Sequence, residues 1–122
     1  MSDAALTYEL SESEDSLPEL RLSGHITGDA LAEAHCDPIG LLGGDAYSKR
    51  VLVDLSGTDF LDSSGIGWLV QQNKLFQSTG GMLVFHSIPP MVSRVIQLMS
   101  LHRVLRIAAD SAAARVLVEG EG

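Results

Sequence analysis

The sequence predicts an α/β fold: a mixed sheet of about five strands, an N-terminal antiparallel hairpin followed by parallel strand–helix repeats. Residues 6–22 contain two short segments in which apolar and polar side chains alternate, as in half-buried strands. Residues 51–118 contain three apolar segments, each followed by a segment of helical character. Such repeats indicate parallel pairing through right-handed crossovers, with helices packed against the sheet. A composition of 45% apolar and 20% charged residues over 122 positions fits one globular domain.

The first part of the chain contains the predicted hairpin and a short helix. Strands are expected over Leu6–Leu10 and Leu17–Leu22, joined by a polar, acidic turn, and Gly24 is expected to end the second strand. Alanine and leucine in Asp29–Ala34 favour a helix, which Pro38 interrupts because proline cannot occupy a helix interior. Gly40, Gly43 and Gly44 then weaken any continuation of the helix, and the sequence leaves the structure of residues 28–47 open.

The second part of the chain contains the strand–helix repeats. Three buried strands are expected, over Val51–Leu55, Met82–Phe85 and Val104–Ile107. Three helices are expected after them, over Ser63–Ser78, from Pro89-Pro90 through Met99, and over Ser111–Val118. A loop over Thr58–Asp62 is expected to join the first of these strands to its helix, and the tail from Glu119 is expected to fray.

The charge of the chain limits its partners. The net charge is −8, with 13 acids and 3 bases in residues 1–62 and 3 acids and 5 bases in residues 63–122. Binding to nucleic acid needs clustered Lys and Arg, so nucleic acid is not an expected partner. An anionic membrane surface is not expected for the same reason. The acidic part of the chain either attracts a basic protein surface or serves solubility, and charge alone does not choose between them.

Other sequence features predict a cytoplasmic protein without a metal or cofactor. No apolar run approaches the roughly 20 residues of a membrane span, and the N-terminus lacks the basic and apolar regions of a signal peptide. The single cysteine, Cys36, cannot form an internal disulfide. His35-Cys36-Asp37 contains metal-ligand types, but adjacent residues rarely converge on one ion, and zinc sites prefer spaced pairs. The sequence gives no reason to expect a bound cofactor.

The strongest local signal is the segment Asp59–Gly67, which follows a buried strand and opens the long helix. Asp and Ser are preferred N-caps, so capping alone explains Asp62, Ser63 and Ser64. Hydroxyls at a helix N-terminus, beyond the carboxyl end of a parallel strand, also lie where ligands bind on open α/β sheets. A phosphate there would face the positive end of the helix. Capping and a phosphorylation switch are compatible, since one residue caps while another faces solvent.

Val53-Asp54-Leu55-Ser56, followed by Phe60-Leu61-Asp62-Ser63-Ser64-Gly65-Ile66-Gly67, resembles the signature of the STAS domain. This domain occurs in bacterial anti-sigma factor antagonists and in the tails of sulphate transporters. The similarity extends downstream, for example to Pro89–Val95, which resembles the family's next helix. The resemblance implies that residues 1–122 form a single STAS domain with a core over about residues 7–118.

The resemblance implies a partner switch and not an enzyme. In the family, the unphosphorylated antagonist binds an anti-sigma factor that is also a serine kinase, and this frees the sigma factor. Phosphorylation of the first serine of the motif, here Ser63, separates the complex, and a serine phosphatase resets it. Gly65 and Gly67 are expected to let a partner's backbone approach, and Trp68 fits either a contact or the core. The residues expected to bind the partner are Asp62, Ser63, Ser64, Gly65, Gly67, Trp68 and Gln72.

Gly24-His25-Ile26-Thr27 departs from the family pattern, which often has Gly-Glu-Leu/Ile-Asp at this place. Two carboxylates near the serine are therefore missing, which makes a phosphate on Ser63 easier to tolerate and bears on which kinase is accepted. The alternative function is a STAS adaptor that is never phosphorylated, such as a stressosome-like component or a transporter accessory subunit. A serine hydrolase is not expected, because the motif lacks the Gly-x-Ser-x-Gly elbow. Such an enzyme would need a histidine base, for which His25 is best placed.

Overall fold

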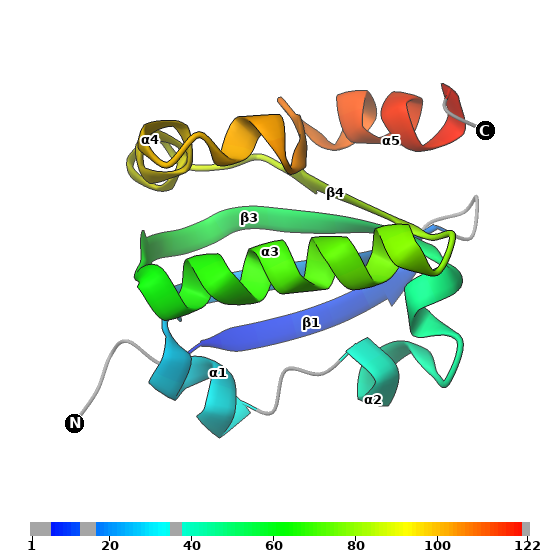
Figure 1. Ribbon diagram of the computed structural model, residues 1–122, viewed down its shortest axis with the longest axis horizontal. Coiled ribbons are helices and arrows are strands. Elements are labelled where there is room, and N and C mark those ends of the chain that lie inside the picture. Colours follow the sequence, from blue (N-terminus) through cyan, green and yellow to red (C-terminus); the bar gives the residue numbers. More distant parts are fainter. Residues whose placement is uncertain (1–5, 13–16, 35–37, 121–122) are drawn as a thin grey trace.

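Five strands form one mixed sheet in the computed structural model, which describes residues 6–12, 17–34 and 38–120 (Figure 1). The strands are β1 (Thr7–Glu12), β2 (Pro18–Ile26), β3 (Arg50–Leu61), β4 (Met82–His86) and β5 (Arg106–Ala108). The α-helices are α1 (Gly28–Ala34), α2 (Pro38–Leu42), α3 (Ser63–Ser78), α4 (Pro90–Leu98) and α5 (Ser111–Gly120). Two 3-10 turns are η1 (Ala46–Ser48) and η2 (Leu101–Arg103).

The sheet has the mixed pairing that the sequence predicts. The spatial order is β1-β2-β3-β4-β5, with β1 antiparallel to β2 and each later pair parallel. Each parallel pair is joined through a helix, as strand–helix–strand units require. The carboxyl ends of β2, β3 and β4 therefore lie at the same edge of the sheet.

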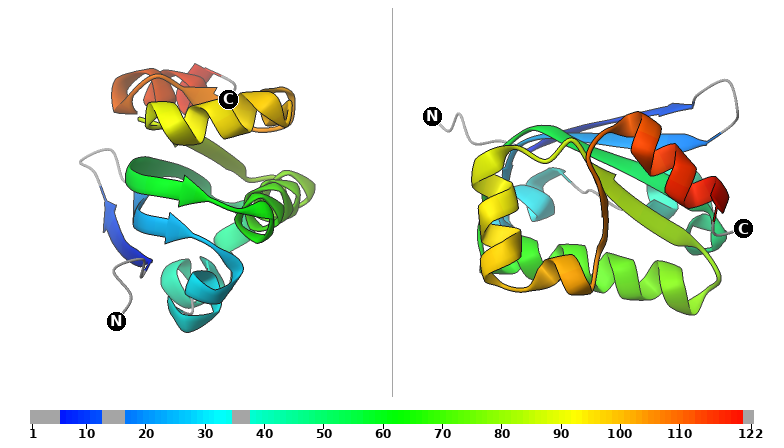
Figure 2. Two further views of the ribbon diagram at one scale, coloured as in Figure 1. Left: turned by 90° about the vertical axis from the view of Figure 1, so that its left-hand side faces the viewer. Right: turned by 90° about the horizontal axis from the view of Figure 1, so that it is seen from above.

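The two faces of the sheet have different cores. On β3, Val51, Val53 and Leu55 belong to the larger cluster, which also contains buried residues of α1, α3 and α4. The intervening Leu52 belongs to a smaller cluster with Val84 and residues of α5. Alternate side chains of a strand point to opposite faces, so α3 and α5 cover different sides of the sheet (Figures 1 and 2). The face that carries α5 also holds Asp54 and His86, which lie two residues beyond Leu52 and Val84 on their strands.

Two strands are longer than the sequence predicts. β2 continues through Gly24 to Ile26, and β3 runs to Leu61, so no loop covers Thr58–Asp62. The two extensions pair with each other, Gly24 with Thr58 and Ile26 with Leu61, after shifts of register. The long-range partner supplies hydrogen bonds that the local Ser-Gly sequence does not suggest, and it brings the end of β2 beside the segment that opens α3.

Smaller differences lie elsewhere in the chain. Leu101–Arg103 forms a 3-10 turn and Leu105 is buried, so β5 begins at Arg106, later than predicted. α5 continues to Gly120, so Glu119 and Gly120 belong to the helix and not to the frayed tail that the sequence predicts. The centre of the predicted hairpin turn, residues 13–16, lies outside the described residues. Among the helices that the structure describes, none has the length and apolarity needed to span a bilayer.

Candidate functional site

Two helices begin at the edge of the sheet where β2 and β3 end. Ile26 and Leu61 are register partners, and each is followed by a residue that caps the next helix. The Ala30 amide donates to Thr27 Oγ1 over 3.1 Å at the start of α1, and the Gly65 amide donates to Asp62 Oδ1 over 2.8 Å at the start of α3. The edge therefore presents two capped helix N-termini side by side.

The N-cap of α3 is Asp62, and neither of the serines that follow it takes this role. Ser63 and Ser64 are exposed, and Asp62 is half-buried. Within the described part of the chain, neither serine side chain donates or accepts a hydrogen bond. The first amides of a helix have no acceptor inside the helix and carry partial positive charge. An acceptor-rich group on either hydroxyl would thus lie beside these amides.

The two glycines of the motif have different structural roles. A Cβ on Gly65 would lie 2.1 Å from the Ile26 carbonyl oxygen, so only glycine lets the first turn of α3 approach β2 this closely. Gly65 is buried, and internal packing, not the approach of a partner, accounts for its identity. A Cβ on Gly67 would meet nothing within 4 Å, and this residue is exposed. No internal contact requires glycine at Gly67.

Two side chains predicted to contact a partner lie toward the interior. Trp68 is half-buried and packs against the larger core cluster, which corresponds to the core alternative for this residue. Gln72 is only 7% exposed, so its side chain is not available on the outer surface of α3. Helical spacing explains both positions, because they lie on the same face of α3 as the buried Leu69 and Phe76.

The stretch Gly24–Thr27 lies beside the motif, so its unusual sequence bears on the site. His25 is the register partner of Phe60, with ring centroids 5.3 Å apart. Its Nε2 lies 3.0 Å from Asp59 Oδ1. No hydrogen bond joins Ser63 or Ser64 to a histidine in the described residues, so the nucleophile–base pair of a serine hydrolase is not formed there. The two positions that resemble the family's acidic positions carry His25 and Thr27, and His25 pairs with Asp59 on β3.

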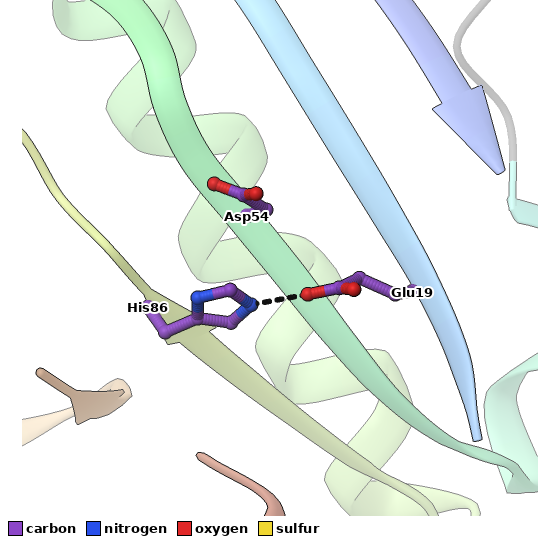
Figure 3. A group of neighbouring side chains, drawn as sticks. All are labelled: Glu19, Asp54 and His86. Carbon is purple, nitrogen blue, oxygen red and sulfur yellow. Dashed lines mark hydrogen bonds and ion pairs between the residues drawn. The ribbon is translucent and has the colours of Figure 1, made fainter. Parts of the chain in front are cut away.

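A second polar group, which the sequence analysis did not predict, lies on the face of the sheet that α5 partly covers. We call Glu19, Asp54 and His86 the sheet-face cluster (Figure 3). His86 Nε2 lies 2.6 Å from Glu19 Oε2, and its Nδ1 lies 2.8 Å from Ser87 Oγ. His86 on β4 is the register partner of Asp54 on β3. Glu19 lies on β2, which pairs with the other edge of β3. Only the register of the three strands reveals this grouping.

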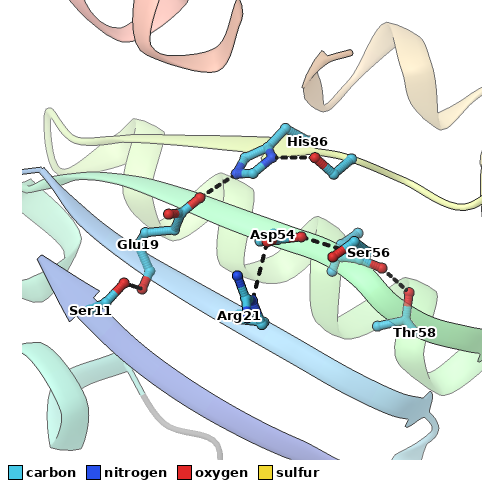
Figure 4. A network of polar contacts seen from close by, with 9 residues as sticks. Ser11, Glu19, Arg21, Asp54, Ser56, Thr58 and His86 are labelled. Carbon is cyan, nitrogen blue, oxygen red and sulfur yellow. Dashed lines mark hydrogen bonds and ion pairs between the residues drawn. The ribbon is translucent and has the colours of Figure 1, made fainter. Parts of the chain in front are cut away.

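The carboxylate of Asp54 lies at the centre of this network (Figure 4). Burial disfavours its charge, but the hydrogen bonds from Ser56 and the electrostatic effects of His86 and Arg21 outweigh burial and lower the pKa of Asp54. The Ser56 amide donates to Oδ1 over 2.8 Å, and Arg21 Nε lies 3.3 Å from Oδ2. Asp54 is therefore held as a carboxylate with one oxygen fixed by the backbone.

The remaining sequence candidate for metal binding, His35-Cys36-Asp37, lies outside the described residues.

Comparison with known proteins gives consistent similarities over most of the chain. The profile of the STAS domain matches residues 6–118. An anti-sigma factor antagonist from Mycobacterium paratuberculosis has a similar structure, with a TM-score of 0.73 and 23% identity, covering 97% of both chains. A STAS domain protein from Planctomyces limnophilus has a TM-score of 0.76 and 19% identity, covering 92% of this chain and 97% of that one. The phosphorylated form of the Bacillus cell fate determinant SpoIIAA has a TM-score of 0.64 and 17% identity, covering 91% and 99%.

Proposed function

The chain belongs to the STAS domain family, and we propose that it is an anti-sigma factor antagonist controlled by phosphorylation of Ser63. The unphosphorylated protein binds an anti-sigma factor with serine kinase activity in the cytoplasm and thereby frees a sigma factor. The kinase transfers a phosphoryl group to Ser63, the complex separates, and a serine phosphatase restores the binding form. The protein acts by binding and not by catalysis.

The observation that carries this proposal is the division of roles at the start of α3. Asp62 accepts the capping hydrogen bond from Gly65, while Ser63 is exposed. A phosphoryl group on Ser63 therefore replaces no side-chain hydrogen bond among the residues that the structure describes. Its oxygens would lie near the free first amides and the positive end of α3, which stabilise an anion there. The site suits a reversible change of charge that leaves the fold intact.

The charge of the phosphate supplies the reason for release. It adds about −1.5 to −2 next to Asp62, in the more acidic part of the chain. At a protein interface, a charge that finds no partner or meets a like charge costs several kcal/mol. Asp59 is already paired with His25, so this histidine offers little free positive charge to the phosphate. The charge added at Ser63 is thus expected to repel groups of the partner more than it disturbs contacts within this chain.

The proposed binding surface is smaller than the sequence motif. Its exposed members are Ser63, Ser64 and Gly67, with the half-buried Asp62 beside them. Gly67 offers backbone without a side chain, which suits close approach of a partner. Trp68, Gly65 and Gln72 support this surface from within, by holding α3 on the sheet.

The proposal is tested by mapping phosphorylation and binding together. Protein purified from its native host is analysed by intact mass and by peptide mapping across residues 60–74, where a phosphoryl group adds about 80 Da. In parallel, wild-type, Ser63→Ala and Ser63→Asp proteins are compared for binding of the kinases retained from host lysate. Ser64→Ala is the matched control, because it removes an adjacent exposed hydroxyl.

We expect phosphate on Ser63, retention of an anti-sigma factor kinase by Ser63→Ala and by Ser64→Ala, and much weaker binding by Ser63→Asp. Equal affinity of Ser63→Ala and Ser63→Asp would contradict the switch. A Ser63 that stays unmodified under every growth condition would favour the alternative, a STAS adaptor that is never phosphorylated. In that case capping by Asp62 is sufficient to explain the motif.

A further inference from the structure

We propose that the sheet-face cluster is a binding site for a divalent transition-metal ion, with Glu19, Asp54 and His86 as its protein ligands. The site lies on the face of the sheet opposite α3 and is independent of the role of Ser63. Each residue comes from a different strand, and the pairing of Asp54 with His86 fixes two of them opposite each other. A rigid sheet therefore holds the ligand set.

The donor atoms are spaced closely enough for one ion. One ligand atom from each residue lies within 4.8 Å of the others, and His86 Nε2 and Glu19 Oε2 are 2.6 Å apart. Ligands about 2.1 Å from a tetrahedral ion lie roughly 3.4 Å from one another. To bind one ion, Glu19 Oε2 and His86 Nε2 must move slightly apart, and both must move slightly closer to the Asp54 carboxylate. The Glu19 side chain is 21% exposed and has the freedom to make this adjustment.

The contacts around the cluster orient the ligands. Ser87 Oγ lies 2.8 Å from His86 Nδ1, so Nδ1–H can donate to the hydroxyl, and an ion would displace the proton that Nε2 shares with Glu19. Hydrogen bonding of the second ring nitrogen is typical of histidines that bind metals. The Ser56 amide engages Asp54 Oδ1, and Oδ2 contacts the exposed side chain of Arg21. These outer contacts are present before any ion binds.

The charge balance favours a cation. Two carboxylates face the cluster, and among the described residues the positive Arg21 side chain is paired only with Asp54 Oδ2. The Arg21 side chain is 58% exposed, so it can turn to solvent when an ion takes its place. An imidazole with two carboxylates suits zinc and neighbouring first-row metals better than calcium or magnesium, which prefer oxygen ligands alone. Water would complete the coordination beside Glu19, whose side chain is 21% exposed.

The test is a titration of the full chain, freed of metal by a chelator, with Zn²⁺ in a calorimeter and with Co²⁺ by visible absorption. Cys36→Ser is the reference protein, because a cysteine thiolate binds zinc by itself. Glu19→Gln and Asp54→Asn each remove one ligand charge with little change of shape. Asp59→Asn is the matched control, because it removes a carboxylate from the other histidine–aspartate pair, which lies outside the cluster.

We expect one saturable site in the reference protein and in Asp59→Asn, with the visible bands of cobalt in a site of low symmetry. Loss of a ligand is expected to weaken binding by more than about 100-fold, since even outer contacts contribute 10- to 100-fold. Absence of saturable binding below millimolar zinc, or unchanged affinity in Glu19→Gln, would overturn the proposal. If Asp54→Asn does not fold, the zinc affinity of Glu19→Gln alone tests the site, because Glu19 is only half-buried and its substitution is expected to leave the fold intact.

Discussion

The N-terminus of α3 and the sheet-face cluster each use an aspartate, but they are built in different ways. Asp62 acts within one helical turn, where its carboxylate accepts from Gly65 and leaves the outer serines exposed. Asp54 belongs to a network across three strands, in which the Glu19–His86 contact joins residues 67 positions apart. Local contacts are enough to leave the serines at the start of α3 exposed, whereas a fixed group of charges needs the register of a sheet.

The largest expected effect comes from breaking the contact between the start of α3 and β2. Gly65→Ala places a Cβ against the Ile26 carbonyl oxygen and is expected to reduce the free energy of unfolding by about 3 kcal/mol. Gly67→Ala is the matched control, because it adds the same atom in open space and should raise helix stability by about 0.5–1 kcal/mol. Urea denaturation measures both. Similar effects of the two substitutions would contradict the packing role of Gly65.

A smaller loss of stability is expected when the side chain of Asp54 loses its charge. Asp54→Asn keeps an acceptor for the Ser56 amide but removes the charge that faces Arg21 and His86, which should reduce the free energy of unfolding by about 1–2 kcal/mol at neutral pH. Because the folded-state pKa of Asp54 is lowered, its contribution is present above the unfolded-state pKa. It is lost as the pH falls through the folded-state value.

Wild-type and Asp54→Asn proteins should therefore converge in stability on acidification. The measurement is urea denaturation from neutral to acidic pH with a chelator present. The other charged groups at this face, Glu19, His86 and Arg21, are unchanged between the two proteins. A stability difference that grows toward low pH would contradict the assigned direction of the pKa shift.

The smallest effect on stability is expected within the motif, where a residue that caps the helix can be compared with an exposed one. Asp62→Ala removes the N-cap of α3 and is expected to reduce the free energy of unfolding by about 1 kcal/mol. Ser63→Ala should change it by less than about 0.5 kcal/mol, because the serine side chain is exposed and does not cap. Thermal unfolding of the two variants at one pH decides this. A cost of Ser63→Ala as large as that of Asp62→Ala would mean that the serine has a structural role.

The features that the sequence predicts well are those determined by residues close to one another in the sequence. The alternating hairpin, the buried strands at Val51 and Met82 and the start of α3 at Ser63 follow from periodicity and capping preferences. The exposure of Ser63 is also consistent with the expectation that one residue caps while another faces solvent.

The features that the sequence does not predict depend on distant partners. Gly24 and Thr58 continue their strands because they pair with each other, although neither residue favours a strand alone. Gln72 is buried because it lies on the inner face of α3, against the usual preference of glutamine for the surface. His86 meets Glu19 only through a register that no local pattern specifies.

The close contact between Gly65 and the Ile26 carbonyl has a consequence for the range of any signal carried by Ser63. The first turn of α3 packs directly on the backbone of β2, so the helix has no room to move toward the sheet in response to a charge added there. Its influence then spreads through solvent, where salt reduces it over about 10 Å. Under the proposed phosphorylation of Ser63, the added charge would therefore act on a molecule that touches this edge of the sheet and not on the distant end of the domain.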